Sequence, residues 1–407
     1  MSIFRQAATL AISAAVAASA LADRFVDLVN AAYERVPEDR RSDLVLLPRL
    51  IDMQAPPEIL LQRADRAALV LTSSPVWGSV ESWATAQEQQ AVLEAIATIT
   101  AEDNPRRAMQ FALPYGINGV PTDFIRAGIH AELGDPPTLA AVQLGYMEQF
   151  NWMKLLVDVE TTRLVEAGES ERAVELNLQL AAFARQIAER QLGEEVIWAY
   201  ETIASAMRRV RDVVYVDSKT TRSLSSQFLI DTVAGIDVER GLYRIDRLKP
   251  PPGDKQAALQ LVERVFDSSG RPDPAVFPSA MAEMAATGKP LRLFAEAGRW
   301  AEDVDSHASA QETRTAIEGV FNDWNTRWNS GAFDPIQRST SAYRLLESRP
   351  QGFGLITEAV PDLGTLLDLR KAVQAETVGT RVAPAAKAPN VATGAKASTL
   401  AIPPPPY

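Results

Sequence analysis

Apolar residues recur at steps of three and four positions along most of the chain, the spacing of an α-helix with a buried face. One stripe consists of Val196, Tyr200, Ile203, Met207, Val210 and Val214. An earlier stripe consists of Ala173, Leu176, Leu180, Phe183 and Ile187. The helix with the earlier stripe carries a second apolar row, Val174, Leu178, Ala181 and Ala188. A helix that is apolar over so wide an arc is packed between neighbours.

The predicted helix ends fall where the sequence offers caps. Gly168 follows a long helical stretch and suits a left-handed C-terminal cap. Ser309 and Glu312 have the spacing of a capping box, which predicts the start of a helix that runs to Trp328.

These elements predict an all-α fold of stacked helical hairpins, arranged as a bundle or as an α-solenoid-like array. A proline-rich stretch at residues 249–256 indicates a boundary between a helical domain, residues 23–248, and a second helical part, residues 257–376, packed on the first. One continuous helical array fits the pattern equally well.

Residues 380–407 differ from the rest of the chain because alanine, proline, lysine, threonine and glycine predominate. With so few large apolar groups the segment cannot offset the entropy of ordering, so we predict a disordered tail. Its end reads PPPPY at residues 403–407 and favours the polyproline helix.

A short stretch at residues 164–180 reads LVEAGESERAVELNLQL. Gly168, Glu169, Ala173 and Val174 have the spacing of the turn in tetratricopeptide repeats, which this stretch resembles. The resemblance implies two helices that approach closely at a small residue. The upstream helix departs from the family pattern, and no second copy follows at the family period of about 34 residues.

Residues 1–22 have the pattern of a cleavable secretory signal peptide: the early charge of Arg5, an alanine-rich apolar stretch, and small residues up to Ala22. The apolar stretch is shorter than the about 20 residues that a bilayer span needs. We therefore expect cleavage after Ala22 and a periplasmic or secreted location. No later stretch is expected to cross a membrane.

The chain has 407 residues, no cysteine and a formal net charge of −11. The lack of cysteine excludes disulfides, thiolate metal sites and a cysteine nucleophile, and the acidity disfavours nucleic acid as a partner. Phosphate-binding glycine loops and the common hydrolase motifs are absent from the sequence, so we expect no cofactor. Two histidines are too few for a multi-histidine metal site, and no metal is expected.

Four candidate catalytic residues lie near a glycine-containing loop at residues 114–119: Tyr115, Asn118, Arg126 and His130. These residue types resemble the set with which helical-toroid polysaccharide lyases neutralise a uronate and move a proton. For His130 the alternative is a cation that is favoured near the C-terminus of a short helix.

Glu160 falls on the inward face of a stripe that includes Met153 and Val157. A buried carboxylate needs a partner. We expect a structural ion pair with an arginine of a neighbouring helix, and the alternative is a general acid with a raised pKa.

Trp324 and Trp328 line one side of the helix predicted after the capping box. Aromatic rows pack in cores and also stack on sugars or peptides, so core packing and ligand binding both stay open.

His307 is expected to lie in a solvated loop. The neighbouring carboxylates of Glu302, Asp303 and Asp305 suggest calcium ligands, but the segment lacks the glycine and the distal glutamate of a calcium-binding loop.

From these features we expect an exported, non-enzymatic helical interaction or scaffold protein of the cell envelope, with a protein or an envelope polymer as its partner. The alternative is a helical enzyme that acts on a glycan, of the lyase or hydrolase type. A third hypothesis is a solute-binding helical protein with a closed pocket near its tryptophans.

Overall fold

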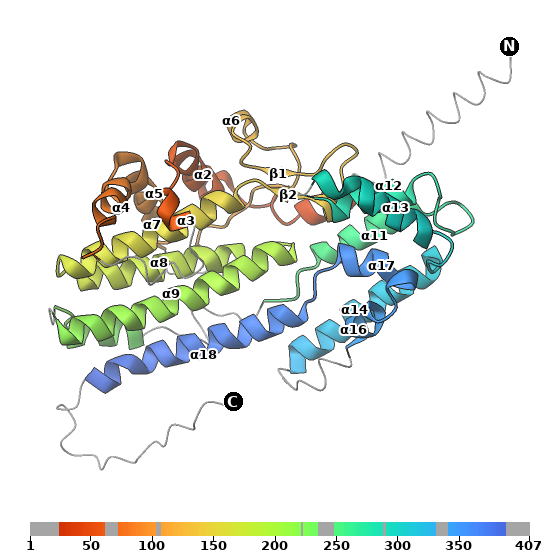
Figure 1. Cartoon of the computed structure of the whole chain (residues 1–407). Coiled ribbons are helices and arrows are strands. Elements are labelled where there is room, and N and C mark those ends of the chain that lie inside the picture. Colours follow the sequence, from red (N-terminus) through yellow and green to blue (C-terminus); the bar gives the residue numbers. More distant parts are fainter. Residues whose placement is uncertain are drawn as a thin grey trace.

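The computed structural model describes residues 24–61, 72–102, 107–220, 223–234, 248–287, 290–330 and 341–387. Within these ranges the protein is helical almost throughout, which confirms the predicted fold class (Figure 1). The predicted signal peptide lies outside the described residues. None of the helices in the described ranges combines the length and the apolar character needed to span a bilayer.

The elements follow in chain order. After helical residues 24–30 come η1 (Glu38–Arg40), α2 (Ser42–Asp52), α3 (Glu58–Leu61), α4 (Trp77–Ala84), α5 (Gln87–Ile99) and α6 (Thr122–Arg126). The next are β1 (Ala131–Glu132), η3 (Leu139–Ala141), β2 (Gln143–Leu144), α7 (Met147–Glu166), α8 (Ser170–Ile187), α9 (Gly193–Lys219), α10 (Ser226–Phe228) and η4 (Leu229–Ala234). The last are α11 (Gly253–Val265), α12 (Phe277–Ala285), η5 (Pro290–Arg292), α13 (Leu293–Asp303), α14 (Ala310–Ser330), α16 (Ala342–Glu347), α17 (Pro350–Ala359) and α18 (Gly364–Lys387).

Four long helices form the central layer of the fold. α7, α8 and α9 pack in sequence order, and α18 packs along α9 (Figure 1). Gly168, between α7 and α8, has a φ of 77°, the left-handed conformation predicted for this cap. The apolar stripe predicted between residues 196 and 214 is buried along α9, as expected for a helix with neighbours on several sides.

The N-terminal helices cover the outer face of this layer. α4 and α5 pack on α7, α5 also contacts α8, and α2 lies against α5. Beneath them, the ring centroid of Phe150 lies 5.2 Å from that of Phe183 and 5.1 Å from that of Trp198. Such aromatic contacts add to the hydrophobic stabilisation of the layer.

The region after residue 248 packs α14 and α17 around α11. The predicted capping box is confirmed at the start of α14. The backbone N–H of Ser309 donates to the Glu312 carboxylate at 2.9 Å, and the backbone N–H of Glu312 donates to Ser309 Oγ at 3.3 Å.

The predicted start of the tail at residue 380 is too early, because α18 continues through Lys387. Thr380 is buried, and its hydroxyl donates to the carbonyl oxygen of Met207 at 2.9 Å. Arg211 of α9 also forms an ion pair with Glu376. Composition alone did not reveal that α9 supplies partners for these small and polar residues. The rest of the predicted tail, residues 388–407, lies outside the described residues.

The N-termini of α9 and α11 meet where the two predicted parts join. The backbone N–H of Gly253 donates to the carbonyl oxygen of Gln191, and the backbone N–H of Gly193 donates to Asp254 Oδ2, both at 2.9 Å. A Cβ atom at Gly253 would lie 2.5 Å from the carbonyl oxygen of Gln191. Glycine is therefore required for this close approach of two backbones.

We predict that Gly253→Ala lowers the free energy of unfolding by about 1–3 kcal/mol, because the added methyl group forces two backbone segments apart. The control is Gly319→Ala in α14, where a Cβ atom meets nothing within 4 Å. This variant should gain about 0.5–1 kcal/mol from helix propensity. Urea denaturation of the two variants measures both changes, and a neutral Gly253→Ala would contradict the close approach.

Candidate functional site

The loop that contains Tyr115 is held on two sides. The Asn30 amide donates to the carbonyl oxygen of Tyr115 at 2.9 Å, and its Oδ1 accepts from the backbone N–H of Tyr115 at 2.8 Å. From α8's C-terminal side, Arg190 Nη1 donates to the carbonyl oxygen of Leu113 at 2.7 Å. These contacts fix the loop so that the Tyr115 side chain enters the core.

A buried ion pair lies at the end of this side chain. Arg190 Nε donates to Glu195 Oε1 at 2.6 Å, and both side chains have 0% exposure. The hydroxyl of Tyr146 donates to the same carboxylate oxygen at 2.5 Å, while the hydroxyl of Tyr115 donates to Glu195 Oε2. The carboxylate therefore has three partners, which is what a charge removed from water requires.

Aromatic rings surround the guanidinium of this pair. Arg190 Cζ lies 4.3 Å from the ring centroid of Tyr33 and 4.4 Å from that of Tyr115. The ring of Phe111 lies 5.4 Å away. Stacking of this kind stabilises a weakly hydrated guanidinium inside a protein. We refer to Tyr33, Tyr115, Tyr146, Arg190 and Glu195 as the Arg190 cluster.

The protonation states of the Arg190 cluster follow from burial. Burial raises the pKa of Tyr33 to about 12 and raises the pKa values of Tyr115 and Tyr146 well above their ordinary value, so all three are neutral hydrogen-bonding groups at pH 7. Burial alone would lower the pKa of Arg190, but Glu195 and the three tyrosines together outweigh burial and raise this pKa well above its ordinary value. Neither side chain of the ion pair is exposed, and both oxygens of its carboxylate accept hydrogen bonds, whereas the buried hydroxyl of Tyr33 has no hydrogen-bond partner.

The backbone segment that contains Tyr115 and Asn118 lies close to the segment that contains His130. The N–H of Gly116 donates to the carbonyl oxygen of Ala131 at 2.9 Å, which places the loop beside β1. Asn118 is exposed, whereas His130 is 9% exposed and its buried Nδ1 has no hydrogen-bond partner. The hydroxyl of Tyr115 points away from both, toward Glu195.

Glu160 forms an ion pair within its own helix. Arg163, one turn later on α7, donates through Nε and Nη2 to the two carboxylate oxygens, both at 2.8 Å. The predicted partner on a neighbouring helix is therefore wrong: the arginine comes from the same helix. Hydrogen bonding to Glu160 raises the pKa of Arg163. A carboxylate held by both oxygens is a structural group in this geometry.

Trp324 and Trp328 are both buried on α14. Trp328 Nε1 donates to the carbonyl oxygen of Leu248 at 2.5 Å. The guanidinium of Arg370, on α18, lies 4.5 Å from the Trp328 ring centroid. Protein groups thus occupy the positions at which a stacked ligand would lie against Trp328.

His307 is buried rather than solvated, contrary to the prediction. Its ring contacts those of Phe266 and Phe277, with centroids 5.8 Å and 5.0 Å away. Its Nδ1 lies 2.9 Å from the carbonyl oxygen of Ala308, and the backbone N–H of Leu355 donates to Nε2 at 3.4 Å. Burial lowers the pKa of His307, which keeps it neutral. The loop is covered by α17, which sequence proximity does not reveal.

The described carboxylates near His307 do not form a metal site. In the described part of the chain, no group of three or more histidine, aspartate or glutamate side chains could hold a metal ion. Glu302, Asp303 and Asp305 are among the residues described.

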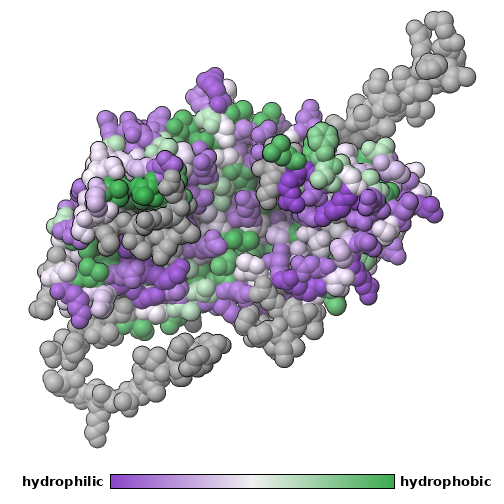
Figure 2. Space-filling view, viewed as in Figure 1, coloured by the Kyte–Doolittle hydropathy of each residue, from purple (hydrophilic) through white to green (hydrophobic). Residues whose placement is uncertain are grey.

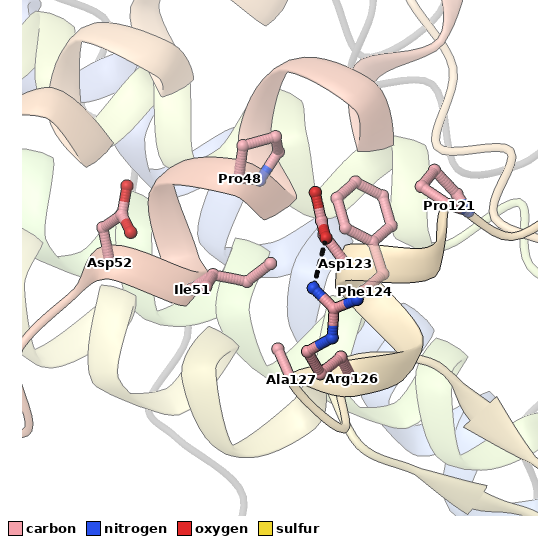
Figure 3. Close-up of a pocket in the computed structure, with 8 residues that line it drawn as sticks. All are labelled: Pro48, Ile51, Asp52, Pro121, Asp123, Phe124, Arg126 and Ala127. Atoms are coloured by element: carbon pink, nitrogen blue, oxygen red, sulfur yellow. Dashed lines mark hydrogen bonds and ion pairs between the residues drawn. The ribbon is translucent and has the colours of Figure 1, made fainter.

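An open groove of about 480 Å³ lies between α2 and α6. Its lining consists of Pro48, Ile51, Asp52, Pro121, Asp123, Phe124, Arg126 and Ala127. Ile51 and Phe124 point toward the space between the two helices (Figure 3). Arg126 and Asp123 form an exposed ion pair of 3.1 Å at the rim. In the space-filling view, α6 forms a hydrophilic projection with hydrophobic surface near its base (Figure 2).

Sequence reasoning named Arg126 but missed the groove. Pro48 inside α2 and Pro121 before α6 are visible in the sequence. The sequence does not show that these two prolines line the same groove, because the two helices are far apart along the chain and α6 is short. A proline inside a helix was the signal that α2 has an unusual surface.

We predict that Glu195→Gln lowers the free energy of unfolding by about 3 kcal/mol or more, because it leaves Arg190 charged and uncompensated in the core. The control is Glu201→Gln, at an exposed position further along α9, which should change stability by less than about 0.5 kcal/mol. Chemical denaturation checks both values. Equal changes in the free energy of unfolding at the two positions would contradict a specific contribution of the buried ion pair.

A second prediction concerns pH. Burial raises the pKa of Asp254 well above its ordinary value, and Glu195 and Glu194 add to the effect of burial. Between the unfolded and folded pKa values the folded state binds more protons, so this residue lowers stability as pH rises. Asp254→Asn, which keeps an oxygen for the Gly193 N–H, should therefore gain stability relative to the wild type as pH rises above the unfolded-state pKa of about 4. A stability difference that does not change with pH would contradict the raised pKa.

Comparison with known proteins finds no matching family model, no matching curated protein and no matching solved structure. The function is therefore inferred from the geometry of the chain itself.

Proposed function

We propose that the protein is an exported, non-enzymatic helical binding protein of the cell envelope, and that the groove between α2 and α6 holds its ligand. The observation that carries this proposal is the contrast between two sets of polar groups. Candidate acid–base residues Tyr115 and Glu160 are engaged in buried structural networks. The groove, by comparison, is open and presents Arg126 to solvent.

The lining of the groove favours an extended apolar peptide that carries a carboxylate. Pro48 and Ile51 are half-buried and offer apolar contact, whereas Phe124 is buried and contributes little of the exposed surface. Pockets of this kind accept alternate side chains of an extended peptide. A volume of about 480 Å³ suits a few side chains. Because Arg126 and Asp123 are both exposed, a carboxylate of the ligand can replace Asp123 as the partner of the guanidinium.

The envelope location rests on residues 1–22, whose charge, apolar stretch and small terminal residues favour export. The absence of cysteine suits a protein that folds without disulfides outside the cytoplasm. The acidic net charge of −11 further favours a protein or polymer partner over nucleic acid.

The test uses protein recovered from the periplasm, whose mature chain should begin at Asp23. The probe is a fluorescein-labelled peptide with the sequence of residues 399–407, TLAIPPPPY, because it is apolar, extended and ends in a free carboxylate. Ile51→Ala and Arg126→Ala should each weaken binding about tenfold or more by fluorescence anisotropy, through lost apolar contact and a lost charge-assisted hydrogen bond.

The matched control is Arg172→Ala, which removes another exposed arginine paired three residues away, with Glu169. This variant should bind the peptide as the wild type does. Absence of measurable binding, or equal affinity in all variants, would rule out the groove as the peptide site. A mature chain that still starts at Met1 would contradict export.

A further inference from the structure

Two large apolar side chains, one in η5 and one in the first turn of α13, are almost completely exposed. Leu291 is 97% exposed and Phe294 is 87% exposed, which exceeds every other exposed large apolar side chain in the described ranges. Side chains of this size normally gain about 1.5–3 kcal/mol each from burial. Their exposure, three residues apart, therefore marks an apolar surface that the described chain leaves uncovered.

The apolar surface continues along one face of the helix. Residues three and four positions apart share a face, so Ala295 and Gly298 extend the row that Leu291 and Phe294 begin. A Cβ atom at Gly298 would meet nothing within 4 Å, which shows that this face is open. We call these four residues the α13 stripe.

The other side of α13 is already packed. Trp300 is buried, and its ring lies so close to Gly354 of α17 that a Cβ atom there would be 2.6 Å from the ring. α13 also packs extensively on α12. The helix is thus apolar on two sides, of which the protein covers one. A helix with this pattern needs a second apolar environment.

Two arginines border the α13 stripe on one edge. Arg292 and Arg299 are seven residues apart, which places them on the same side of the helix. Both bind the Glu296 carboxylate at 3.1 Å while their side chains stay about half exposed, at 57% and 49%. Arg299 also forms an ion pair with Glu358 at 3.1 Å, so two carboxylates hold the two guanidinium groups at the border of the apolar row. The exposed N–H groups of these arginines can donate to lipid phosphates.

We propose that α13 is a lipid-binding helix, which lies in the plane of a membrane interface with Leu291 and Phe294 inserted among the acyl chains. The pattern of aromatic and aliphatic residues on one face, with arginines beside them, is typical of interfacial helices. A stable protein dimer needs about 800 Å² on each partner, far more than two side chains supply. This role is independent of the peptide groove.

The charge of the whole protein sets the choice of lipid. A net charge of −11 repels anionic membranes at long range, but screening at physiological salt limits this repulsion to about 8 Å. At the α13 stripe the two arginines are balanced by Glu296 and Glu358, so its border carries no net positive charge. We expect insertion into zwitterionic bilayers, with the arginines on the lipid phosphates.

The test is flotation of the mature protein with phosphatidylcholine vesicles. The double variant Leu291→Ser and Phe294→Ser should lose about tenfold or more of its vesicle partitioning, because the apolar contribution is removed. The control is Leu345→Ser on α16, another exposed leucine at 59%, which should float as the wild type does. Because both sites are exposed, thermal unfolding should stay within a few degrees of the wild type.

Two results would overturn the proposal. The first is a wild-type protein that does not float, or a double variant that floats equally well. The second is a wild-type dimer in analytical ultracentrifugation that the double variant abolishes, with no vesicle binding. That outcome would assign the α13 stripe to a second copy of the chain.

Discussion

The buried ion pair between Arg190 and Glu195 is the interaction on which the rest of the fold depends. Either charge alone would be very costly in the core, so each fixes the position of the other and of the tyrosines that complete their hydrogen bonds. The hydrogen-bonding tyrosines come from the loop before α6 and from the residue that precedes α7, and the ring of Tyr33, in the turn after helical residues 24–30, stacks on Arg190. One desolvated charge pair thus holds together segments that are far apart in the sequence.

The burial of these charged and polar groups determines which groups remain on the surface of the protein. Its most strongly perturbed tyrosines and its buried arginine are directed inward, where they stabilise the helical layer. The surface retains the groove beside α6 and the apolar row on α13.

The sequence predicted those features that depend on local periodicity. The stripe on α9, the cap at Gly168 and the capping box at Ser309 are set by residues within a few positions of one another. The predictions for His307, and for the partner of Glu160, failed because they required knowledge of packing and rotamer choice. The groove was missed for the same reason, since two distant helices form it. Long-range pairing is the information that a periodic pattern lacks.

The contact between α9 and α18 has a consequence for the order of folding. Arg211 and Glu376 are separated by 165 positions, so the central layer gains its last helix only when distant parts of the chain meet. Closing so long a loop carries an entropic cost and slows folding. A chain whose native topology closes late stays unfolded longer after synthesis, and an unfolded chain is the form that a narrow translocation channel accepts.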